Sequence, residues 1–149
     1  MAEGVSILAV TSRYYRHVAA ELEAGLEAAL VAEGASVDFL EVPGAFELPG
    51  AIGLAAAAAG YDGFVALGCV LRGETSHYDL ICNEVARGLM DLSLAGVPVG
   101  FGVLTCETEE QALERADRAR KNKGAEAAAA VLRMVELSRQ FEDQDHERA

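Results

Sequence analysis

The chain has 149 residues, and 12 Lys and Arg against 24 Asp and Glu give it a formal net charge of −12. A surface with this charge repels phosphate backbones and anionic lipids, which argues against nucleic-acid binding and against attachment to a membrane. The length suits a single domain over residues 1–149, and a hydrophobic fraction of 52% suffices for a packed core.

The cysteines indicate a reducing compartment. Cys69, Cys82 and Cys106 form no CxxC pair, and an odd number without a framework favours reduced thiols. No basic segment precedes the first apolar run, so we expect no secretory signal. Together these features predict a cytoplasmic protein.

The first half of the chain predicts strands and helices in alternation. An apolar run at 5–11 indicates a buried strand. A helix that ends at Gly34 follows, with apolar positions every four residues: Val18, Leu22, Leu26 and Leu30. Weak alternation at 37–42 predicts a second strand, and Pro49 suits the first turn of a helix that continues to residue 60.

The second half continues the alternation. The run at 64–71 is apolar throughout, as expected of a parallel strand covered on both faces. A helix over 76–94 and a strand over 97–104 follow. Thr108 is suited to cap a helix that contains Ala112, Ala116 and Ala119. A last helix spans roughly 122–141, and the polar residues 142–149 are expected to form a frayed tail.

This order predicts an α/β fold: a three-layer α/β/α sandwich around a four-stranded parallel sheet, with a flavodoxin-like layer order. In such sheets, ligands bind at the carboxyl ends of the strands. The rule selects four loops as candidate binding segments: 12–16, 43–48, 72–77 and 105–107.

The loop after the third strand, Arg72-Gly-Glu-Thr-Ser-His-Tyr-Asp79, carries the strongest local signal. Gly73 permits a tight turn, and the backbone N–H groups at Glu74 and Thr75 lie at a helix N-terminus, where they can hold a phosphate. His77 would lie beside that anion, where an imidazole can transfer protons near neutral pH. Two plainer roles stay open: Thr75 or Ser76 as a helix cap, and His77 as a structural or merely exposed residue.

The first two loops offer weaker candidates. Tyr14 and Tyr15 could form a stacking platform for a flat ring, or pack on the edge of the core. Glu47 could accept hydrogen bonds from ligand hydroxyls, or simply lie at the start of a helix.

The sequence lacks the residues that several common kinds of catalytic centre require. His17, His77 and His146 have no histidine partner at i+3 or i+4, so we expect no metal site. The nucleophile elbow, the P-loop and the G-x-G-x-x-G fingerprint are absent from the sequence. Lys121 and Lys123 are the two lysines, and a carbonyl condensation without a catalytic lysine needs a substrate that brings its own amine.

Five segments of the chain occur in the same order in a known family. They are Val42-Pro-Gly-Ala-Phe-Glu-Leu-Pro49, Ala66-Leu-Gly-Cys-Val-Leu-Arg-Gly-Glu-Thr-Ser-His-Tyr78, Phe101-Gly-Val-Leu-Thr105, Glu110-Gln-Ala-Leu-Glu-Arg115 and Asn122-Lys-Gly124. Together they resemble lumazine synthase, the penultimate enzyme of riboflavin biosynthesis, over residues 7–141. The resemblance implies condensation of 5-amino-6-(D-ribitylamino)uracil with 3,4-dihydroxy-2-butanone 4-phosphate to 6,7-dimethyl-8-ribityllumazine, without a metal or organic cofactor. It also implies a homo-oligomer with active sites between adjacent subunits, and riboflavin synthase as a candidate partner.

The resemblance assigns a role to each matching residue. Tyr14 takes the place of a ring-stacking aromatic that is usually Phe. The pyrimidine and ribityl chain would lie against Ala45, Phe46, Glu47, Cys69, Val70, Leu71 and Phe101, with Phe101 reaching into the site of a neighbouring subunit. The phosphate would lie against Gly73, Glu74, Thr75, Arg115 and Lys123. His77 would be the catalytic acid/base that moves protons during imine formation and phosphate loss.

One stretch departs from the family pattern. Residues 116–122 lack the Gly- and Thr-containing bend that helps pentamers of the family join into icosahedral shells. Without Gly or Pro, nothing in this stretch is expected to break a helix. We therefore expect a free pentamer, or a decamer, rather than a sixty-subunit shell.

Three other functions remain alternatives. A non-catalytic lumazine- or flavin-binding module would share Tyr14 and the ribityl contacts, but it has no need of a phosphate loop, His77 and Arg115 together. A structural shell protein is disfavoured by the missing bend. A flavodoxin-like electron carrier shares the layer order alone, which is weak evidence of function.

Overall fold

The computed structural model describes residues 2–58, 60–73 and 76–148. Its elements in chain order are β1 (Ser6–Ser12), α1 (Arg16–Ala32), β2 (Ser36–Val42), the 3-10 turn η1 (Ala45–Glu47), α2 (Leu48–Ala57), β3 (Gly63–Leu71), α3 (His77–Leu94), β4 (Val99–Cys106), α4 (Glu109–Ala116) and α5 (Lys123–Arg148). These strands form one parallel sheet in the order β2-β1-β3-β4. The predicted α/β class and four-stranded parallel sheet are therefore confirmed.

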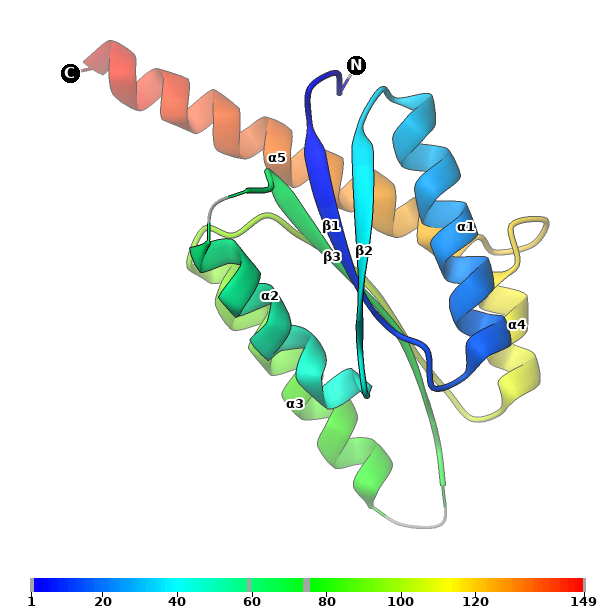
Figure 1. Ribbon diagram of the computed structural model, residues 1–149. Coiled ribbons are helices and arrows are strands. Elements are labelled where there is room, and N and C mark those ends of the chain that lie inside the picture. Colours follow the sequence, from blue (N-terminus) through cyan, green and yellow to red (C-terminus); the bar gives the residue numbers. More distant parts are fainter. Residues whose placement is uncertain (1, 59, 74–75, 149) are drawn as a thin grey trace.

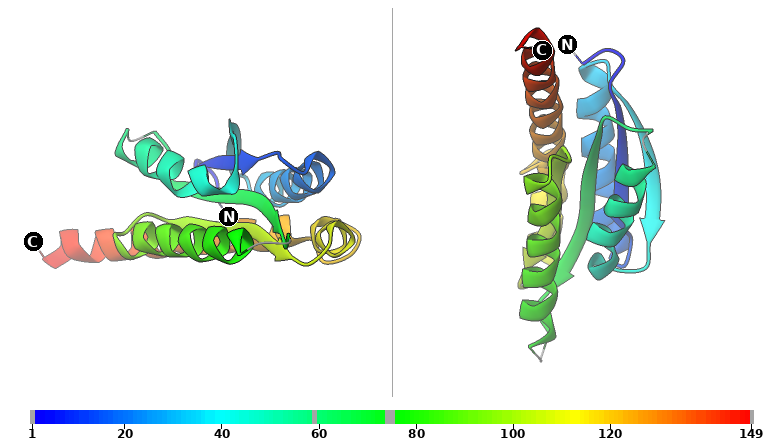
Figure 2. Two further views of the ribbon diagram at one scale, coloured as in Figure 1. Left: turned by 90° about the horizontal axis from the view of Figure 1, so that it is seen from below. Right: turned by 90° about the vertical axis from the view of Figure 1, so that its left-hand side faces the viewer.

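Helices cover both faces of the sheet. In Figure 1, β2 lies nearest the viewer, α2 and α3 lie to the left of the sheet, and α1 and α4 lie to the right. The two further views in Figure 2 show the sheet running between these layers, with α3 and α5 on the side away from β2. The C-terminal turns of α5 project past the end of the sheet (Figure 1).

Each face of the sheet has its own apolar core. On the α1 side, the predicted stripe of α1 is fully buried and packs with Val131 and Val135 of α5. On the other side, Leu48 and Ile52 of α2 pack with Val85 of α3 and the sheet. Gly34 has a φ of +87°, the left-handed conformation expected of a glycine that ends a helix.

Several element boundaries differ from the prediction, and α2 ends at Ala57 rather than at residue 60. β4 begins at Val99 because Pro98 has no N–H to pair, although its carbonyl accepts a 2.9 Å bond from the Phe64 amide. α4 ends at Ala116, so Ala119 lies outside the helix to which it was assigned. α5 continues to Arg148, so residues 142–148 are helical where a frayed tail was expected. This tail contains neither Gly nor Pro, so it carries no strong helix breaker.

The expectation that nothing breaks the helix between α4 and α5 is wrong. The chain leaves the helical conformation at Asp117, whose carboxylate accepts a 2.8 Å bond from the Ala119 amide. Asn122 then adopts a φ of +47°, and its side chain accepts a bond from the Ala125 amide at the start of α5. Asp and Asn bend the chain here because their short side chains bond to nearby backbone and tolerate left-handed geometry.

α5 begins against the middle of α1. A Cβ at Gly124 would collide with the carbonyl oxygen of Leu22 and would lie 2.8 Å from the Leu26 nitrogen. Only glycine allows the two helix backbones to come this close. The contact fixes the start of α5, and with it the position of Lys123.

Candidate active site

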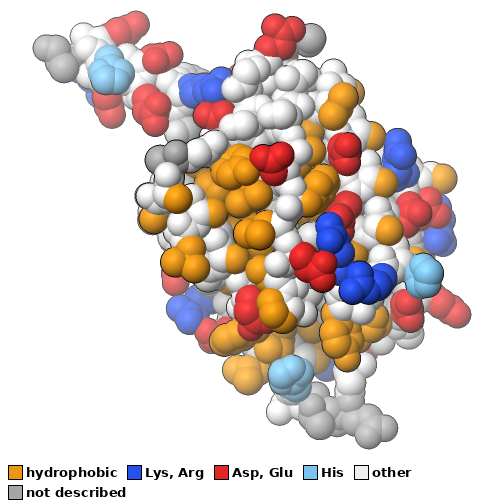
Figure 3. All heavy atoms as spheres, viewed as in Figure 1, with side chains coloured by type: hydrophobic (Ala, Val, Ile, Leu, Met, Phe, Trp, Pro, Cys, Tyr) orange, Lys and Arg blue, Asp and Glu red, His pale blue; other side chains and the backbone are white. Residues whose placement is uncertain are grey.

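The loops that follow the four described strands meet at one end of the sheet, the lower end in Figure 1. Hydrophobic side chains gather at this end of the molecule, and others cover the face next to α2 (Figure 3). This is the end at which ligands bind in parallel sheets, because the strand ends leave a crevice between the loops.

The β1 loop presents Tyr14 to solvent. Its side chain is 76% exposed, and its ring meets the edge of the Tyr15 ring at 5.0 Å between centroids. Tyr15 is partly buried against the α1-side core, and this burial raises the pKa of its hydroxyl. The two aromatic rings therefore differ: Tyr15 packs inward, and Tyr14 is available for stacking.

The residue before Tyr14 is held by a network of charged groups. Arg13 donates from Nε and Nη2 to the two carboxylate oxygens of Glu23, at 3.0 and 2.8 Å, and from Nη1 to Glu41 at 2.9 Å. The buried hydroxyl of Thr11 donates to Glu23 at 3.1 Å. Hydrogen bonds from Arg13 to Glu23 hold the pKa of this guanidinium even higher than usual. The sequence prediction gave no role to Arg13 or Glu23, because one sequence offers no signal that pairs them.

The loop after β2 folds into η1, and its three side chains differ in exposure to solvent. Ala45 is buried, whereas Phe46 is 58% exposed and Glu47 is exposed. Glu47 occupies the N-cap position of α2, but its side chain makes no capping hydrogen bond. Glu47 therefore lies at the start of a helix, as the plainer alternative expected, and its carboxylate is not used for capping.

The end of β3 supplies Cys69, Val70 and Leu71. The Cys69 side chain is buried in the α1-side core, and burial raises the pKa of its thiol to about 12. Val70 packs toward the opposite core, and Leu71 toward the same core as Cys69. Of Cys69, only the backbone is suited to line a polar ligand, because its thiol lies in the apolar interior.

The loop after β3 is braced by Arg72. Its guanidinium donates to Glu107 at 2.9 Å, lies 3.7 Å from Asp79, and stacks over the Tyr78 ring at 4.3 Å. Burial is the main cause that raises the pKa of Tyr78. The sequence placed Arg72 in the loop but did not foresee that it joins β3, the first turn of α3 and the residue after β4.

The predicted anion loop is described in part. Gly73 is exposed, and Glu74 and Thr75 lie outside the described residues. Ser76 is the N-cap residue of α3, but its side chain makes no capping bond. His77 is the first residue of α3 and is exposed.

A second group of predicted residues lies along the outer edge of β4. Phe101, Arg115 and Lys123 line one cavity of about 280 Å³, together with Thr105 and Glu126. Arg115 donates to the Gln111 carbonyl at 3.2 Å, and Lys123 forms a 2.8 Å ion pair with Glu126. No described residue of the loops at 12–16, 43–48 or 72–77 lines this cavity. The structure therefore gathers Phe101, Arg115 and Lys123 around a cavity that is separate from the described residues of those loops.

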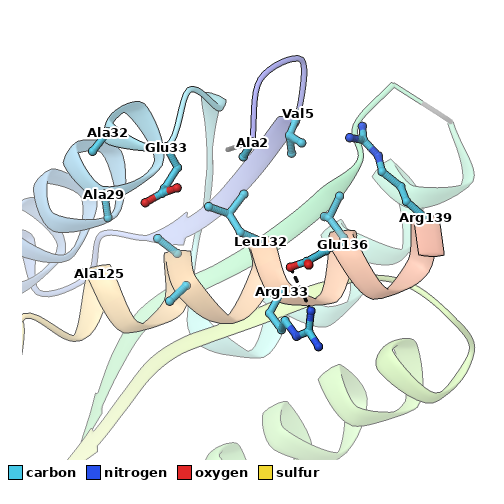
Figure 4. A pocket seen from close by; sticks show the side chains of 13 residues that line it. Ala2, Val5, Ala29, Ala32, Glu33, Ala125, Leu132, Arg133, Glu136 and Arg139 are labelled. Carbon is cyan, nitrogen blue, oxygen red and sulfur yellow. Dashed lines mark ion pairs between the residues drawn. The ribbon is translucent and has the colours of Figure 1, made fainter. Parts of the chain in front are cut away.

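A larger cavity, of about 650 Å³, lies between α1 and α5. Its floor is formed mainly by alanines, with Leu132, and its rim carries Glu33, Arg133, Glu136 and Arg139 (Figure 4). None of the predicted site residues lines it. The larger cavity therefore does not coincide with the candidate site residues, which lie in the strand-end loops and along β4.

Neither a membrane-spanning helix nor a metal-binding cluster is present in the described part of the chain. None of its helices is both long enough and apolar enough to cross a membrane. Within those same residues, no group of three or more His, Cys, Asp and Glu side chains is arranged to hold a metal ion.

The chain is similar to proteins of one family along most of its length. A family model described as 6,7-dimethyl-8-ribityllumazine synthase matches residues 4–139. A protein of that name from Erythrobacter litoralis is 52% identical over 134 residues, which cover 90% of this chain and 96% of the relative. A second, from Sphingopyxis alaskensis, is 52% identical over 91% of this chain and 96% of its own. A third, from Novosphingobium aromaticivorans, is 50% identical over 87% of this chain and 94% of its own.

Proposed function

The chain belongs to the 6,7-dimethyl-8-ribityllumazine synthase family, and we propose that it catalyses the reaction this name describes. It condenses 5-amino-6-(D-ribitylamino)uracil with 3,4-dihydroxy-2-butanone 4-phosphate and releases phosphate and water. The observation that carries the proposal is the match over residues 4–139, because it spans all four strand-end loops.

Binding of the pyrimidine substrate is supported by the first two loops. Tyr14 offers an exposed ring for stacking, and Phe46 adds a second exposed apolar surface. Glu47 has a carboxylate that caps no helix, so it is suited to accept hydrogen bonds from the ribityl hydroxyls. Ala45, Cys69, Val70 and Leu71 line this site, Cys69 through its backbone.

Binding of the phosphate substrate is supported by the start of α3 and by two cations. Gly73 leads into the helix N-terminus, where backbone N–H groups favour an anion. Glu74 and Thr75 are proposed to complete this loop. Arg115 and Lys123 share one cavity, and a guanidinium can bind phosphate through two parallel hydrogen bonds.

His77 is proposed to move protons as the imine forms and as phosphate leaves. The pyrimidine supplies the attacking amine, so no enzyme lysine is required for covalent chemistry. Most of the rate gain comes from holding two substrates in contact, which can contribute up to about 7–11 kcal/mol. General acid/base catalysis by a histidine typically adds a further factor of about 10²–10⁴.

A complete site needs two copies of the chain. Phe101, Arg115 and Lys123 lie at the open β4 edge, apart from the loops that carry Tyr14 and Glu47. An adjacent copy in a ring places one group against the other, and a pentamer is the ring that we propose. A sixty-subunit shell was disfavoured because the chain was expected to lack a bend, but the chain does bend at 117–122. Light scattering distinguishes the pentamer from a decamer and from the shell.

The test is to mix the purified protein with both substrates and to follow lumazine absorbance and phosphate release. We expect a rate above the uncatalysed background, strongly reduced in Arg115→Ala and retained in Arg118→Ala, which removes an exposed arginine just beyond α4. Tight binding of a ribityl-bearing ring without turnover would instead support the non-catalytic binding module.

A further inference from the structure

Little besides the backbone orients Tyr14. Its side chain is 76% exposed, and among the described residues its ring meets that of Tyr15 in a T-shaped contact. α1 starts at Arg16 without a side-chain capping bond and without an acidic residue in its first turn. The usual ways of fixing the start of a helix are therefore missing where the stacking ring needs to be held still.

The Arg13 network ties the loop that carries Tyr14 to two neighbouring elements, α1 and β2. Arg13 follows β1, Glu23 lies on α1, and Glu41 lies on β2, so the guanidinium joins three elements. Thr11 and Glu41 are direct neighbours in the β1–β2 register, and both belong to the network. The Glu23 side chain is only 16% exposed and that of Arg13 is 32% exposed, so water competes less for this pair than for the bond to Glu41, whose side chain is 44% exposed.

The network also shows what Arg13 does not do. From its position in a strand-end loop, this arginine could have been a cation for the phosphate substrate. All three of its guanidinium nitrogens instead donate to carboxylates of the chain. Three of its five N–H donors are thus bonded to carboxylates on α1 and β2, which holds the residue directly before Tyr14.

We infer that Arg13, held by Glu23 and Glu41, is a positioning residue that keeps the Tyr14 ring in place for the pyrimidine substrate. The inference rests on the proposed stacking role of Tyr14. Its consequence is selective: loss of Arg13 weakens pyrimidine binding, whereas binding of the phosphate substrate, which uses other loops, stays unchanged.

The first experiment compares Arg13→Met with the wild type in steady-state kinetics. We expect the KM for the pyrimidine to rise about threefold to tenfold, which lies within the range that corresponds to loss of an aromatic stacking contact. The KM for the phosphate substrate should change by less than about twofold. Arg87→Met is the matched control, because Arg87 also pairs with two carboxylates, Glu84 and Asp91, but on α3 alone.

A double-mutant cycle separates positioning from general stability. If Arg13 acts through Tyr14, Arg13→Met has no further effect on the pyrimidine KM in a Tyr14→Ala background. Equal effects in both backgrounds, or an equal rise in both KM values, would overturn the inference. If Arg13→Met fails to fold, Glu41→Gln replaces it, because this change weakens one bond of the network and leaves the Glu23 pair intact. Glu41→Gln should then raise the pyrimidine KM alone.

The same variants test the underlying site. If Tyr14→Ala leaves the pyrimidine KM at the wild-type value, the proposed stacking role of Tyr14 is wrong, regardless of the result for Arg13→Met. If Tyr14→Ala raises the pyrimidine KM and Arg13→Met does not, Tyr14 still stacks on the pyrimidine, but Arg13 has no positioning role.

Discussion

The guanidinium of Arg72 lies 4.3 Å from the centre of the Tyr78 ring. The same group donates to Glu107 and approaches Asp79. This contact ties the residue that follows β3 to the first turn of α3, and His77 lies in that turn. The position of the proposed acid/base therefore depends on an arginine to which the sequence analysis gave no role of its own.

Replacing Arg72 should impair catalysis more than pyrimidine binding. Arg72→Gln removes both ion pairs and the stacking contact, so the start of α3 is no longer held against the end of β4. We expect kcat to fall roughly tenfold, since small displacements of reacting groups cost rate steeply, while the KM for the pyrimidine stays near the wild-type value. The control is Arg87→Gln, whose ion pairs lie within α3. An unchanged kcat in Arg72→Gln would rule out this bracing role.

His77→Ala should slow the enzyme without abolishing it. Loss of a general acid/base costs about 10²–10⁴ in rate, and the substrates remain held together in the site. Arg115→Ala should reduce kcat/KM for the phosphate substrate further still. His146→Ala, near the distal end of α5, serves as the control in the same assay. Complete inactivity of a folded His77→Ala protein would show that substrate positioning is not the main source of the rate.

Cys69 should make the protein less stable as the pH rises above about 9. Burial raises the folded-state pKa of its thiol from 9.0 to about 12, so between these values the unfolded chain has lost a proton that the folded chain retains. The free energy of unfolding then falls with rising pH, by at most about 1.4 kcal/mol per pH unit from this group. Urea unfolding at pH 8 and pH 10 measures the slope, which should be shallower in Cys69→Ala. Equal slopes in the two proteins would contradict the assignment to Cys69.

Gly124→Ala should destabilise the fold, and Gly50→Ala should not. A Cβ at Gly124 would collide with the Leu22 carbonyl on α1, and overpacking of this kind typically costs about 1–3 kcal/mol. Gly50 lies in the first turn of α2 with nothing within 4 Å of an added Cβ. There, replacement by alanine should stabilise the protein by up to about 1 kcal/mol. Urea unfolding of both variants gives the comparison, and equal changes in stability would refute close packing of α1 and α5 as the cause.

Much of the fold could be predicted from the sequence because its signals are local. The apolar run at 64–71 and the stripe from Val18 to Leu30 report burial through their spacing alone. Parallel strands joined by short crossovers then place their loops at one end of the sheet, so the loops that hold Tyr14, Glu47 and His77 could be selected before any coordinates were known.

The tertiary structure decided two kinds of feature. Some depend on partners that are distant in the sequence, and others depend on side chains that bond to the backbone a few residues away. Arg13 binds Glu41 across 28 positions of sequence, and no periodicity encodes that pair. The bend at 117–122 forms through Asp117 and Asn122 rather than through Gly or Pro, so a search for helix breakers missed it. The strand order places β4 at an open edge, where Phe101, Arg115 and Lys123 gather apart from the other loops. Residue types and their spacing indicate which groups can act, but the side on which each group lies depends on how the sheet is ordered and packed.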